Sequence, residues 1–497
     1  MSIHRKIFHG GLTLGFNQGF TQACSFLRNV IVARILSPAD FGIAAIFFLT
    51  FSLLDMMSNL SADKLLVQAV DGGDPAFQDS AQALQAMRGV MNAVIIFALG
   101  GPVARLFGVP QTAWAFRVLA LLPVLRGFTH LDLSRVQREL KFAPQVVSDS
   151  VSALVVTLAV IPLSFWFRDY SLMLWLLVIQ SAASLLLSHR VADRHYRWAW
   201  DRKYVKRMVT FGWPLLINGV LLYIIFEGDR FVIGASHWLF AQSTYTLADL
   251  GIYSVAFGLA MAPNTLVGNV STSLFLPLLS QAQNDRQEFR RRYAACAELV
   301  AAVATLIAIG FIVAGGPFVV LIYGHKYAGA EAFIGWLGAM WTLRTLRLAP
   351  TLAALSLGDT LNSMVSNITR TAALGGVLLA AATGQSMIWI AISGFLGEVL
   401  ALAVCVLRLQ KEHGIAPISL FRPFTVCGAG MFLASLTNAS GFGQATWLGA
   451  FASAGALVVV MIAVMLAGFP ELRTGMRLMI KKSEPIPTAA AAVPAID

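Results

Sequence analysis

One stretch decides the fold class: residues 10–42 read GGLTLGFNQGFTQACSFLRNVIVARILSPADFG. At about 1.5 Å of rise per residue, a helix of this length and apolar content can cross a lipid bilayer. The same stretch also carries a set of polar side chains, namely Asn17, Gln18, Thr21, Gln22, Ser25, Arg28 and Asn29. Steps of four and seven residues return to one helix face, so Asn17, Thr21 and Arg28 share a face. The stretch therefore predicts a membrane helix with one wet face.

A second stripe of this helix consists of small residues spaced by four, Gly11, Gly15, Gly19 and Ala23. Small residues let helices approach closely in membranes, so this stripe predicts a tightly packed face. An arginine in hydrocarbon costs about 2.5–3.5 kcal/mol on insertion scales, so Arg28 needs a partner or a water-filled space. The two faces together predict a polar, cationic cavity inside the membrane.

The composition extends this interpretation to the whole chain. Of its 497 residues, 57% are hydrophobic and 12% charged, with a mean hydropathy of +0.72. Soluble domains carry about 25% charged residues. Continuous apolar runs near twenty residues predict an all-α polytopic membrane protein and exclude a barrel of short alternating strands. The four cysteines have no metal-ligand spacing, and no P-loop, zinc motif or nucleophile elbow is present, so we expect no catalytic residue, metal or cofactor.

The hydropathy pattern predicts about fourteen spans. Their approximate limits are 10–34, 42–62, 81–101, 113–133, 146–166, 170–189, 209–234, 249–275, 294–314, 328–348, 361–382, 386–407, 421–438 and 446–468. With the N-terminus inside, 26 Lys and Arg residues fall on the cytoplasmic side and six on the other. This asymmetry follows the positive-inside rule and places both termini in the cytoplasm. It also explains the net charge of +11 without nucleic-acid binding.

An internal repeat divides the chain. ADFGI at 39–43 recurs as ADLGI at 248–252, and GGPVARLFG at 100–108 recurs as GGPFVVLIYG at 315–324. The repeat predicts two six-helix bundles, with the substrate path between them and two additional helices at the end. The predicted segments are a bundle at 1–190, a basic cytoplasmic linker at 191–207, a second bundle at 208–408, two extra helices at 409–470 and a disordered cytoplasmic tail at 471–497.

Polar and charged residues within the spans are the candidate functional residues. The candidates for lining the substrate cavity are Arg28, Asn17, Thr21, Arg88, Gln85, Arg126, Arg370 and Asn218. The candidates for coupling an ion are Asp55, Glu227, Asp229 and Glu398. Intramembrane charges mark substrate or ion pathways, and this explanation is favoured for the residues nearer mid-span, namely Arg28, Asp55, Arg126, Arg370 and Glu398. For Arg88, near an interface, an ion pair within the bundle or a side chain reaching the interface explains the residue equally simply.

Two segments resemble a known family. FLRNVIVARILSPADFGIAA at 26–45 and FGWPLLINGVLLYIIFEGDRFVIG at 211–234 are similar to the polysaccharide-transporter (Wzx-type) flippases of the MOP superfamily. The resemblance covers the first twelve spans and is strongest at 10–70 and 208–280. It departs from the related peptidoglycan-precursor flippases at Arg28-Asn29, where those proteins often carry Arg-Asp. This departure leaves Arg28 without a neighbouring acid and weakens any shared coupling role for an acid there.

The resemblance implies a V-shaped bundle in the bacterial inner membrane that moves a polyprenyl-diphosphate-linked oligosaccharide outward for exopolysaccharide or lipopolysaccharide synthesis. The implied partners are membrane lipids, a polysaccharide polymerase and a chain-length regulator. Export of about two negative charges gains roughly 4–5 kcal/mol at 100 mV, so the membrane potential alone is one source of direction. Coupling to protons or sodium through the acids named above is the other.

Two rivals fit the same spans. A cation-coupled multidrug exporter of the same superfamily needs an acidic pocket, so an acidic majority in the cavity favours it. A polytopic polymerase or ligase acting on lipid-linked sugars needs a sizeable external catalytic loop. The predicted external loops are short, and the longest, near residues 237–249, has few titratable groups. We therefore expect a carrier and not an enzyme.

Overall fold

The computed structural model describes residues 3–139, 141–416, 418–441, 446–471 and 473–474, and the side chains within them except those of residues 3–14, 418 and 419. Every regular element in these ranges is a helix. All but residues 471, 473 and 474 of the predicted tail lie outside the described residues. The predicted all-helical fold class is thereby confirmed.

The helices of the first half run from the N-terminus to the basic linker. They are α1 (Ile3–Ile35), α2 (Pro38–Ser58), α3 (Ala62–Gln68), α4 (Pro75–Leu106), η1 (Pro110–Thr112), α5 (Ala113–Leu119), α6 (Leu121–Gly127), α7 (Asp132–Arg138), α8 (Ala143–Trp166) and α9 (Ser171–Val191). The helices of the second half are α10 (Arg202–Leu239), α11 (Leu247–Ser280), α12 (Arg286–Tyr323), η2 (His325–Ala330), α13 (Glu331–Leu346), α14 (Leu348–Ser356), α15 (Leu361–Thr371), α16 (Ala373–Ala382) and α17 (Met387–His413). Two further helices follow, α18 (Ile418–Ala439) and α19 (Trp447–Gly468).

Eleven helices in the described part of the chain are long and apolar enough to cross a membrane, so the count of fourteen is not confirmed. The predicted span 113–133 is divided into α5 and α6, and 328–348 is a short 3-10 helix followed by the 16-residue α13. The first predicted span is the 33-residue α1, whose polar side chains lower its hydropathy. Sequence hydropathy does not distinguish a continuous helix from a broken one.

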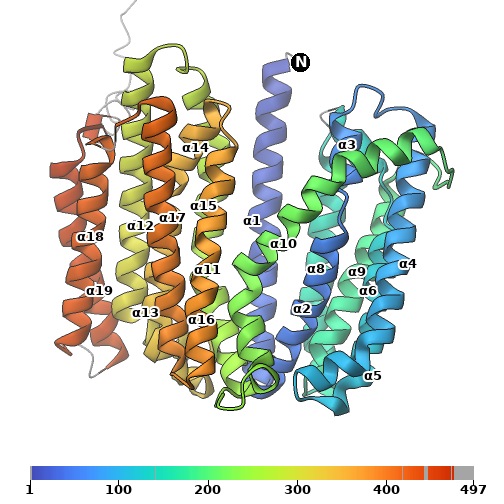
Figure 1. The fold of residues 1–497 in the computed structure, drawn as a ribbon, viewed down its shortest axis with the longest axis horizontal. Helices are drawn as coiled ribbons and strands as arrows, with labels where there is room; N and C mark the ends of the chain where they lie inside the picture. The colour runs from blue at the N-terminus through green and yellow to red at the C-terminus, as the bar shows by residue number, and fades with distance from the viewer. Residues whose placement is uncertain (1–2, 140, 417, 442–445, 472, 475–497) are drawn as a thin grey trace, which may run out of the picture.

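The two halves stand side by side (Figure 1). α4, α5, α6 and α9 form one flank, α12, α13 and α17 form the other, and α1 lies between them. α10 crosses obliquely from the linker into the second half, and α18 and α19 pack against the outside of α12. The N-terminus, α3 and α14 lie at the same end of the bundle, which we call the N-terminal end.

The repeated motif begins the second helix of each half, and both copies are built alike. Ser37 caps α2 by accepting a hydrogen bond from the backbone N–H of Asp40, three residues on. Thr246 caps α11 in the same way through Asp249, whose carboxylate accepts the backbone N–H of Thr246 in return. Such caps satisfy backbone donors that a helix start leaves free.

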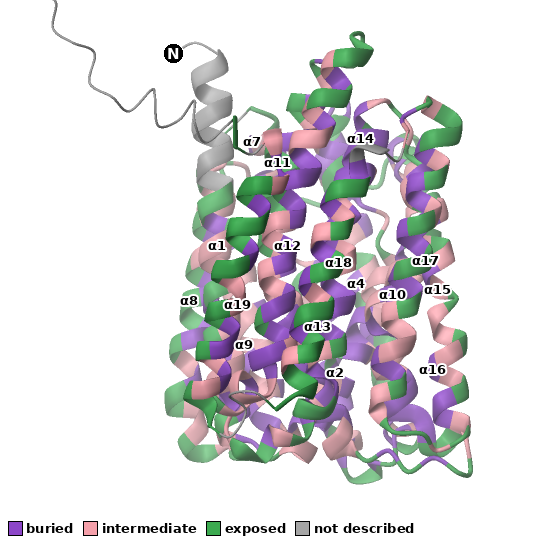
Figure 2. Cartoon of the chain, turned by 90° about the vertical axis from the view of Figure 1, so that its left-hand side faces the viewer, coloured by how far each residue is buried: buried purple, intermediate pink, exposed green. Residues whose placement is uncertain are grey.

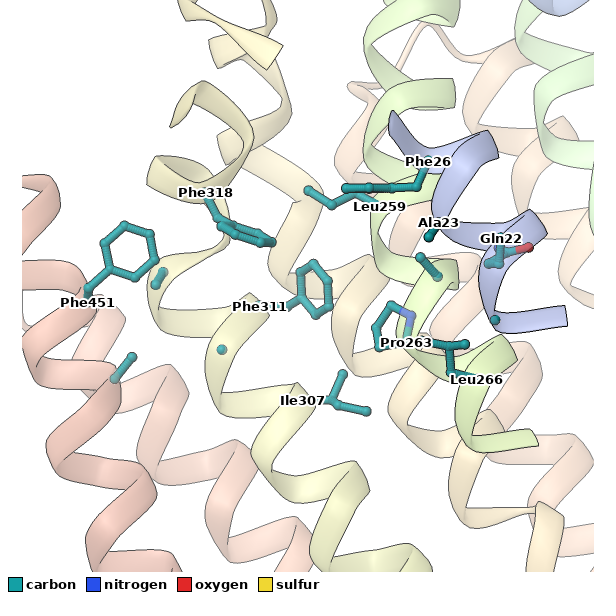
Figure 3. A pocket seen from close by; sticks show the side chains of 15 residues that line it. Gln22, Ala23, Phe26, Leu259, Pro263, Leu266, Ile307, Phe311, Phe318 and Phe451 are labelled. Carbon is teal, nitrogen blue, oxygen red and sulfur yellow. The ribbon is translucent and has the colours of Figure 1, made fainter. Parts of the chain in front are cut away.

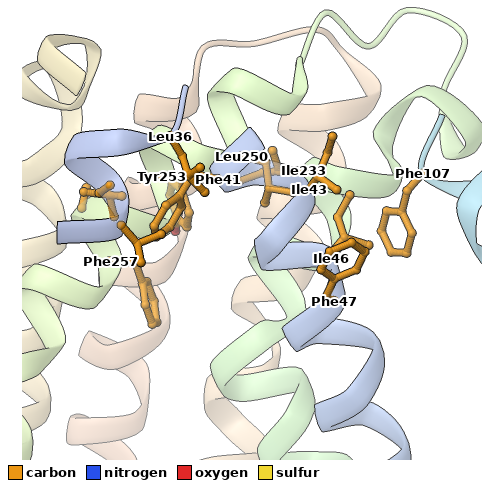
Figure 4. Packing of buried hydrophobic residues seen from close by; sticks show 14 of the residues in the cluster. Leu36, Phe41, Ile43, Ile46, Phe47, Phe107, Ile233, Leu250, Tyr253 and Phe257 are labelled. Carbon is orange, nitrogen blue, oxygen red and sulfur yellow. The ribbon is translucent and has the colours of Figure 1, made fainter. Parts of the chain in front are cut away.

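The two motif copies pack against each other at the end opposite the N-terminus (Figure 4). Leu36 and Phe41 of the first copy lie beside Leu250 and Tyr253 of the second, and all four side chains are buried. This cluster joins the two halves through a dense apolar core. The halves are therefore closed against each other at this end.

The outer surface is apolar, as a lipid-facing surface must be. Large apolar side chains are exposed on many helices, including Phe432 on α18 and Val459 on α19, which are 64% and 67% exposed. Buried residues run along the inner faces of the same helices (Figure 2). With the eleven apolar helices, this surface identifies a multi-pass membrane protein.

The linker after α9 packs on the first half. Gln82 of α4 donates its amide to the carbonyl oxygen of Arg197 at 2.9 Å, and Arg194 donates to Gln78 at 3.0 Å. Further on, Arg207 of α10 pairs with Asp71 at 2.6 Å, and this hydrogen bond holds the pKa of the Asp71 carboxyl below its usual range. These contacts attach the start of the second half to the first.

Candidate functional site

A polar cavity of about 550 Å³ lies inside the first half, within α1, α2, α4, α6, α8 and α9. Asp63 of α3 and Ser134 of α7 also line it, so it reaches the N-terminal end of the bundle. Six of the residues singled out from the sequence line it together, namely Asn17, Thr21, Asp55, Gln85, Arg88 and Arg126. All its lining residues fall between 17 and 188, so the cavity belongs to one half and not, as expected, to the space between the halves.

The charged centre of the cavity joins three helices. Arg88 of α4 donates to the Asp55 carboxylate of α2 at 2.7 Å, and the Arg126 guanidinium of α6 lies 3.9 Å from the other carboxylate oxygen. Arg126 also lies over the Phe51 ring, 4.5 Å from its centroid, and its side chain is 46% exposed. One carboxylate thus contacts two guanidinium groups, and the second, at 3.9 Å, is held loosely enough to turn toward a ligand.

Hydroxyl and amide side chains dominate the walls: fifteen of the 24 lining residues are Ser, Thr, Asn or Gln. Gln85 donates to the Arg126 carbonyl at 3.1 Å and to the Thr129 hydroxyl at 3.0 Å, which ties α4 to the end of α6. Asn17 accepts from Ser150 at 2.6 Å and donates to Asp149 at 3.4 Å, which ties α1 to α8. The walls are therefore fixed by hydrogen bonds yet rich in donors and acceptors.

The charge balance of the cavity differs from the expectation. Three carboxylates line it, those of Asp55, Asp63 and Asp149, against the two guanidinium groups of Arg88 and Arg126. The prediction of a cationic cavity is therefore wrong for this space. The sequence pattern identified the arginines but did not indicate how many acids from other helices face them.

Arg28 lies outside the lining of this cavity. Its side chain is buried, and Nη1 donates at 2.7 Å to Oε1 of Gln180, which does line it. Arg28 is three residues beyond Ser25, about 4.5 Å along the helix, and Ser25 is the last residue of α1 that lines the cavity. Burial lowers the solvation of the guanidinium, and the Gln180 amide is its one hydrogen-bond acceptor among the described side chains.

The second half holds a separate, closed charge cluster around Glu398 of α17. Its fully buried carboxylate pairs with Arg344 at 3.6 Å, with Arg347 at 3.3 Å and with Arg370 at close range. Arg370 also donates to the carbonyl oxygen of Ile225 in α10 at 2.7 Å. The predicted coupling residue Glu398 and the predicted cavity residue Arg370 therefore lie in a network that holds α10, α13, α15 and α17 together.

The acids of α10 are also engaged. Glu227 pairs with Arg230 at 2.6 Å, and the Arg230 guanidinium lies 4.7 Å from the centroid of the Phe257 ring. Asp229 accepts a hydrogen bond from the Tyr253 hydroxyl at 2.6 Å. Asn218 lies exposed on α10, outside the cavity lining.

Several residues of these sites were missed from the sequence. Asp149 and Gln180 were not among the candidates, although Ser148 and Ser152 near the first, and Ser184 and Ser188 after the second, form polar stripes that could have indicated them. Arg344, Arg347 and Arg230 were not among the candidates either, whereas the structure places all three in ion pairs, with Arg347 buried and the other two partly buried. If these three arginines are left out of the count, Lys and Arg residues still lie mainly on the predicted cytoplasmic side.

An apolar pocket of about 540 Å³ lies on the other face of α1, between α1, α11, α12 and α19 (Figure 3). Its walls include Phe26 of α1, Phe311 of α12 and Phe451 of α19. Gly19 lines it, and a Cβ atom at Gly15 or Gly19 would meet nothing within 4 Å. The expectation that these glycines pack tightly is therefore wrong, because at Gly19 the missing side chain leaves room for the pocket.

Comparison with solved structures identifies the fold. The chain superposes on the lipid II flippase MurJ in an inward closed conformation with a TM-score of 0.70, at 12% identity over 91% of this chain and 98% of that one. An inward-facing multidrug resistance MATE family transporter of the MOP superfamily gives a TM-score of 0.61, at 12% identity over 79% of this chain and 96% of that one. At such identity these likenesses establish the MOP-type fold alone.

Curated relatives share a larger fraction of sequence over a shorter length. The succinoglycan biosynthesis transport protein ExoT of Rhizobium meliloti is 25% identical over 64% of this chain and 62% of its own. The lipopolysaccharide biosynthesis protein WzxC of Escherichia coli is 20% identical over 66% of this chain and 65% of its own. The match thus spans just under two thirds of each relative. The model of the polysaccharide biosynthesis protein family matches residues 31–332, more than half of the chain, and the protein belongs to this family.

Proposed function

We propose that this protein is an inner-membrane flippase that moves a polyprenyl-diphosphate-linked oligosaccharide to the outer leaflet for exopolysaccharide or lipopolysaccharide synthesis. The observation that carries the proposal is the polar cavity within the membrane bundle, with its walls of hydroxyl and amide groups. Sugars present many hydroxyl groups, each of which loses water on entering a protein and needs a new partner. Side chains that both donate and accept supply such partners.

The diphosphate fits the charged centre of this cavity. Arginine binds phosphate oxygens through parallel N–H donors, and Arg88 and Arg126 present two such groups on neighbouring helices. In the structure the Asp55 carboxylate contacts both guanidinium groups. A phosphate group would take the place of this carboxylate, so binding exchanges one anion for another and leaves no guanidinium unpaired.

The apolar pocket on the other face of α1 suits the hydrocarbon tail of such a lipid. α1 presents Gln18, Thr21 and Ser25 to the polar cavity, and Gly19, Ala23 and Phe26 to the apolar pocket. A head group and a polyprenyl chain can therefore lie on opposite faces of one helix. This arrangement supports a substrate that is half sugar phosphate and half hydrocarbon.

The transport cycle we propose is alternating access. The cavity reaches the N-terminal end, which the basic asymmetry makes cytoplasmic, while the repeated motifs close the opposite end. The halves 1–190 and 208–408 would rock about this contact, with the linker 191–207 joining them and the helices in 409–470 on the flank. The chemistry is binding and release, so we propose a carrier, served by a polymerase and a chain-length regulator on the outer side.

A second candidate is favoured by one observation, the majority of carboxylates in the cavity. Three acids against two arginines suit a cationic drug better than a diphosphate. The relevant rival is a cation-coupled exporter of the same superfamily. The two functions predict different phenotypes in the same strain.

The test is deletion of the gene in its own host, followed by complementation with the wild-type chain and with an Arg88→Ala, Arg126→Ala double variant. The flippase predicts loss of surface polysaccharide, accumulation of the lipid-linked repeat inside the cell and no rescue by the double variant. Membrane abundance of the variant, measured on blots, controls for insertion. Normal polysaccharide in the deletion strain, together with heightened sensitivity to cationic drugs, would overturn the flippase in favour of the exporter.

A further inference from the structure

Asp149 of α8 stands apart from the other acids of the membrane region. Its carboxylate lines the polar cavity and accepts hydrogen bonds from the Gln145 amide at 2.8 and 2.9 Å and from the Asn17 amide at 3.4 Å. Both donors are neutral. Among the side chains that the structure describes, Asp149 takes part in no ion pair within 4.0 Å.

The four acids suggested by the sequence as ion-coupling groups are all engaged. Asp55, Glu227 and Glu398 are paired with arginines. Asp229 is held by the Tyr253 hydroxyl. A carboxylate that must take up and release a proton during a cycle is poorly served by a permanent cationic partner, because the partner favours the charged form.

Among the described side chains, the charged and titratable groups on the neighbouring elements are directed at partners other than Asp149. On α1, Arg28 bonds to Gln180; on α9, His189 bonds to the Phe128 carbonyl; on α7, Arg135 pairs with Asp132 and Arg138 donates to the Val70 carbonyl. Around the cavity itself, Arg88 and Arg126 are directed at Asp55, His130 accepts from the backbone of Asp132, and Asp63 lies exposed at the start of α3.

This charge balance has a consequence for anion binding. The cavity already holds one carboxylate more than it has guanidinium groups. A diphosphate adds further negative charge to a space in which the carboxylates already outnumber the guanidinium groups. Protonation of Asp149 removes one of these negative charges. Because Asp149 forms no ion pair among the described side chains, its protonation leaves no cation without a partner.

We propose that binding of a lipid diphosphate headgroup in this cavity is linked to uptake of one proton by Asp149, an inference that rests on the proposed function. The carboxylate Oδ gains a proton from cytoplasmic water and becomes an O–H donor. The Gln145 amide, which donates to the charged form, turns to present its carbonyl oxygen to this new donor. Linkage is reciprocal, so the bound headgroup favours the proton as much as the proton favours the headgroup.

The structure also explains how protonation reaches beyond the headgroup. Asn17 donates to Asp149 through its amide nitrogen and accepts from Ser150 through its amide oxygen. The same side chain therefore contacts the Asp149 carboxylate and attaches α1 to α8. Loss of the carboxylate charge weakens the Asn17 contact to Asp149. The proton is thus placed where it loosens α1, the helix between the two halves.

The experiment measures the affinity of the purified full-length protein in lipid nanodiscs for undecaprenyl diphosphate without sugar, between about pH 6 and pH 8. Four chains are compared: wild type, Asp149→Asn, Asp149→Glu and Asp169→Asn. The last changes an acid that accepts a hydrogen bond from the backbone N–H of Ser171 at the start of α9, away from the cavity, and serves as the matched control. The diphosphate's own ionisation affects all four chains equally, so the difference in pH slope reports Asp149.

We expect the wild type, Asp149→Glu and Asp169→Asn to lose affinity with rising pH by up to about tenfold per unit more steeply than Asp149→Asn. Equal slopes in wild type and Asp149→Asn, with tight binding in both, would overturn the proton linkage and leave the flippase intact. Binding of undecaprenyl diphosphate no tighter than that of phosphatidylglycerol in any chain would overturn the proposed function, and the linkage with it. Elution as a single monodisperse peak confirms that each variant is folded.

Discussion

Gly42 and Gly251 hold the two copies of the repeated motif backbone to backbone. A Cβ atom on Gly251 would lie 1.9 Å from the carbonyl oxygen of Pro38, and one on Gly42 would lie 2.0 Å from that of Leu247. No side chain fits at either position without moving a helix. The contact is therefore the point at which the two halves are pressed together, at the end opposite the N-terminus.

Replacing Gly251 with alanine should separate the halves at this end. The added methyl group meets backbone, which cannot turn away as a side chain would, so we expect a destabilisation of about 1–3 kcal/mol or an outward-open shift. The measurement is labelling of a Ser152→Cys reporter in the cavity by a membrane-impermeant thiol reagent added from outside. Gly258→Ala on the same helix is the control, since its Cβ meets nothing within 4 Å. Equal labelling and equal thermal stability of the two variants would contradict the closed contact.

Asp55 is predicted to compete with the substrate for the arginines. The Asp55→Asn variant keeps the shape of the side chain but frees Arg88 and Arg126, so it should bind undecaprenyl diphosphate at least about tenfold more tightly, ~1.4 kcal/mol. Arg126→Ala should weaken binding, because the more exposed guanidinium is the one free to turn. Titration in nanodiscs gives both affinities. Weaker binding by Asp55→Asn would show that the carboxylate positions the arginines and does not compete.

Glu398 is predicted to be structural. Its removal as Glu398→Gln leaves the guanidinium groups of Arg344, Arg347 and Arg370 together without their anion, which should cost about 3–5 kcal/mol of stability. Glu412→Gln on the same helix removes a carboxylate that is 41% exposed and lies 3.9 Å from the Arg408 guanidinium. This change should alter the free energy of unfolding by less than about 1 kcal/mol. Thermal unfolding in detergent compares the two. A fully stable Glu398→Gln protein with altered ion dependence of transport would restore the coupling role first suggested by the sequence.

Arg28→Ala is predicted to abolish polysaccharide export while the protein remains inserted. The arginine acts through Gln180, whose amide it holds toward the cavity, so Gln180→Leu should give the same loss. The measurement is surface polysaccharide in the complemented deletion strain, with membrane abundance checked alongside. Normal polysaccharide from both variants would remove this pair from the site.

Much of the fold could be predicted from the sequence because hydropathy and repeats are local signals. The repeated Ala-Asp-x-Gly-Ile motif indicated two halves, and the structure shows why the motif recurs: the backbone N–H of its Asp donates to the residue that caps the helix, and its Gly meets the other copy. Helix breaks were invisible to hydropathy, since the residues on either side of Leu119 are equally apolar.

The sequence predicted which helix face carries the polar residues of the site. It did not predict how far the cavity extends along the helix or which residues pair with each other. Periodicity placed Asn17, Thr21 and Arg28 on one stripe, yet a cavity ends somewhere along a helix and the stripe does not say where. Partners are set by tertiary packing: Glu398 and Arg344 are far apart in the sequence, and only the fold brings them together. The excess of carboxylates over guanidinium groups in the cavity could not be predicted for the same reason.

Transport of a sugar-diphosphate lipid through the cavity around Arg88 and Arg126 can be tested with the purified protein. The most direct measurement reconstitutes the purified protein in vesicles with a polyprenyl-diphosphate-linked oligosaccharide and follows the fraction of sugar open to an enzyme added outside. We expect wild-type protein to expose the inner-leaflet pool, while the Arg88→Ala, Arg126→Ala protein and protein-free vesicles leave it protected. Equal exposure by the double variant and the wild type, or protection in both, would contradict transport through this cavity.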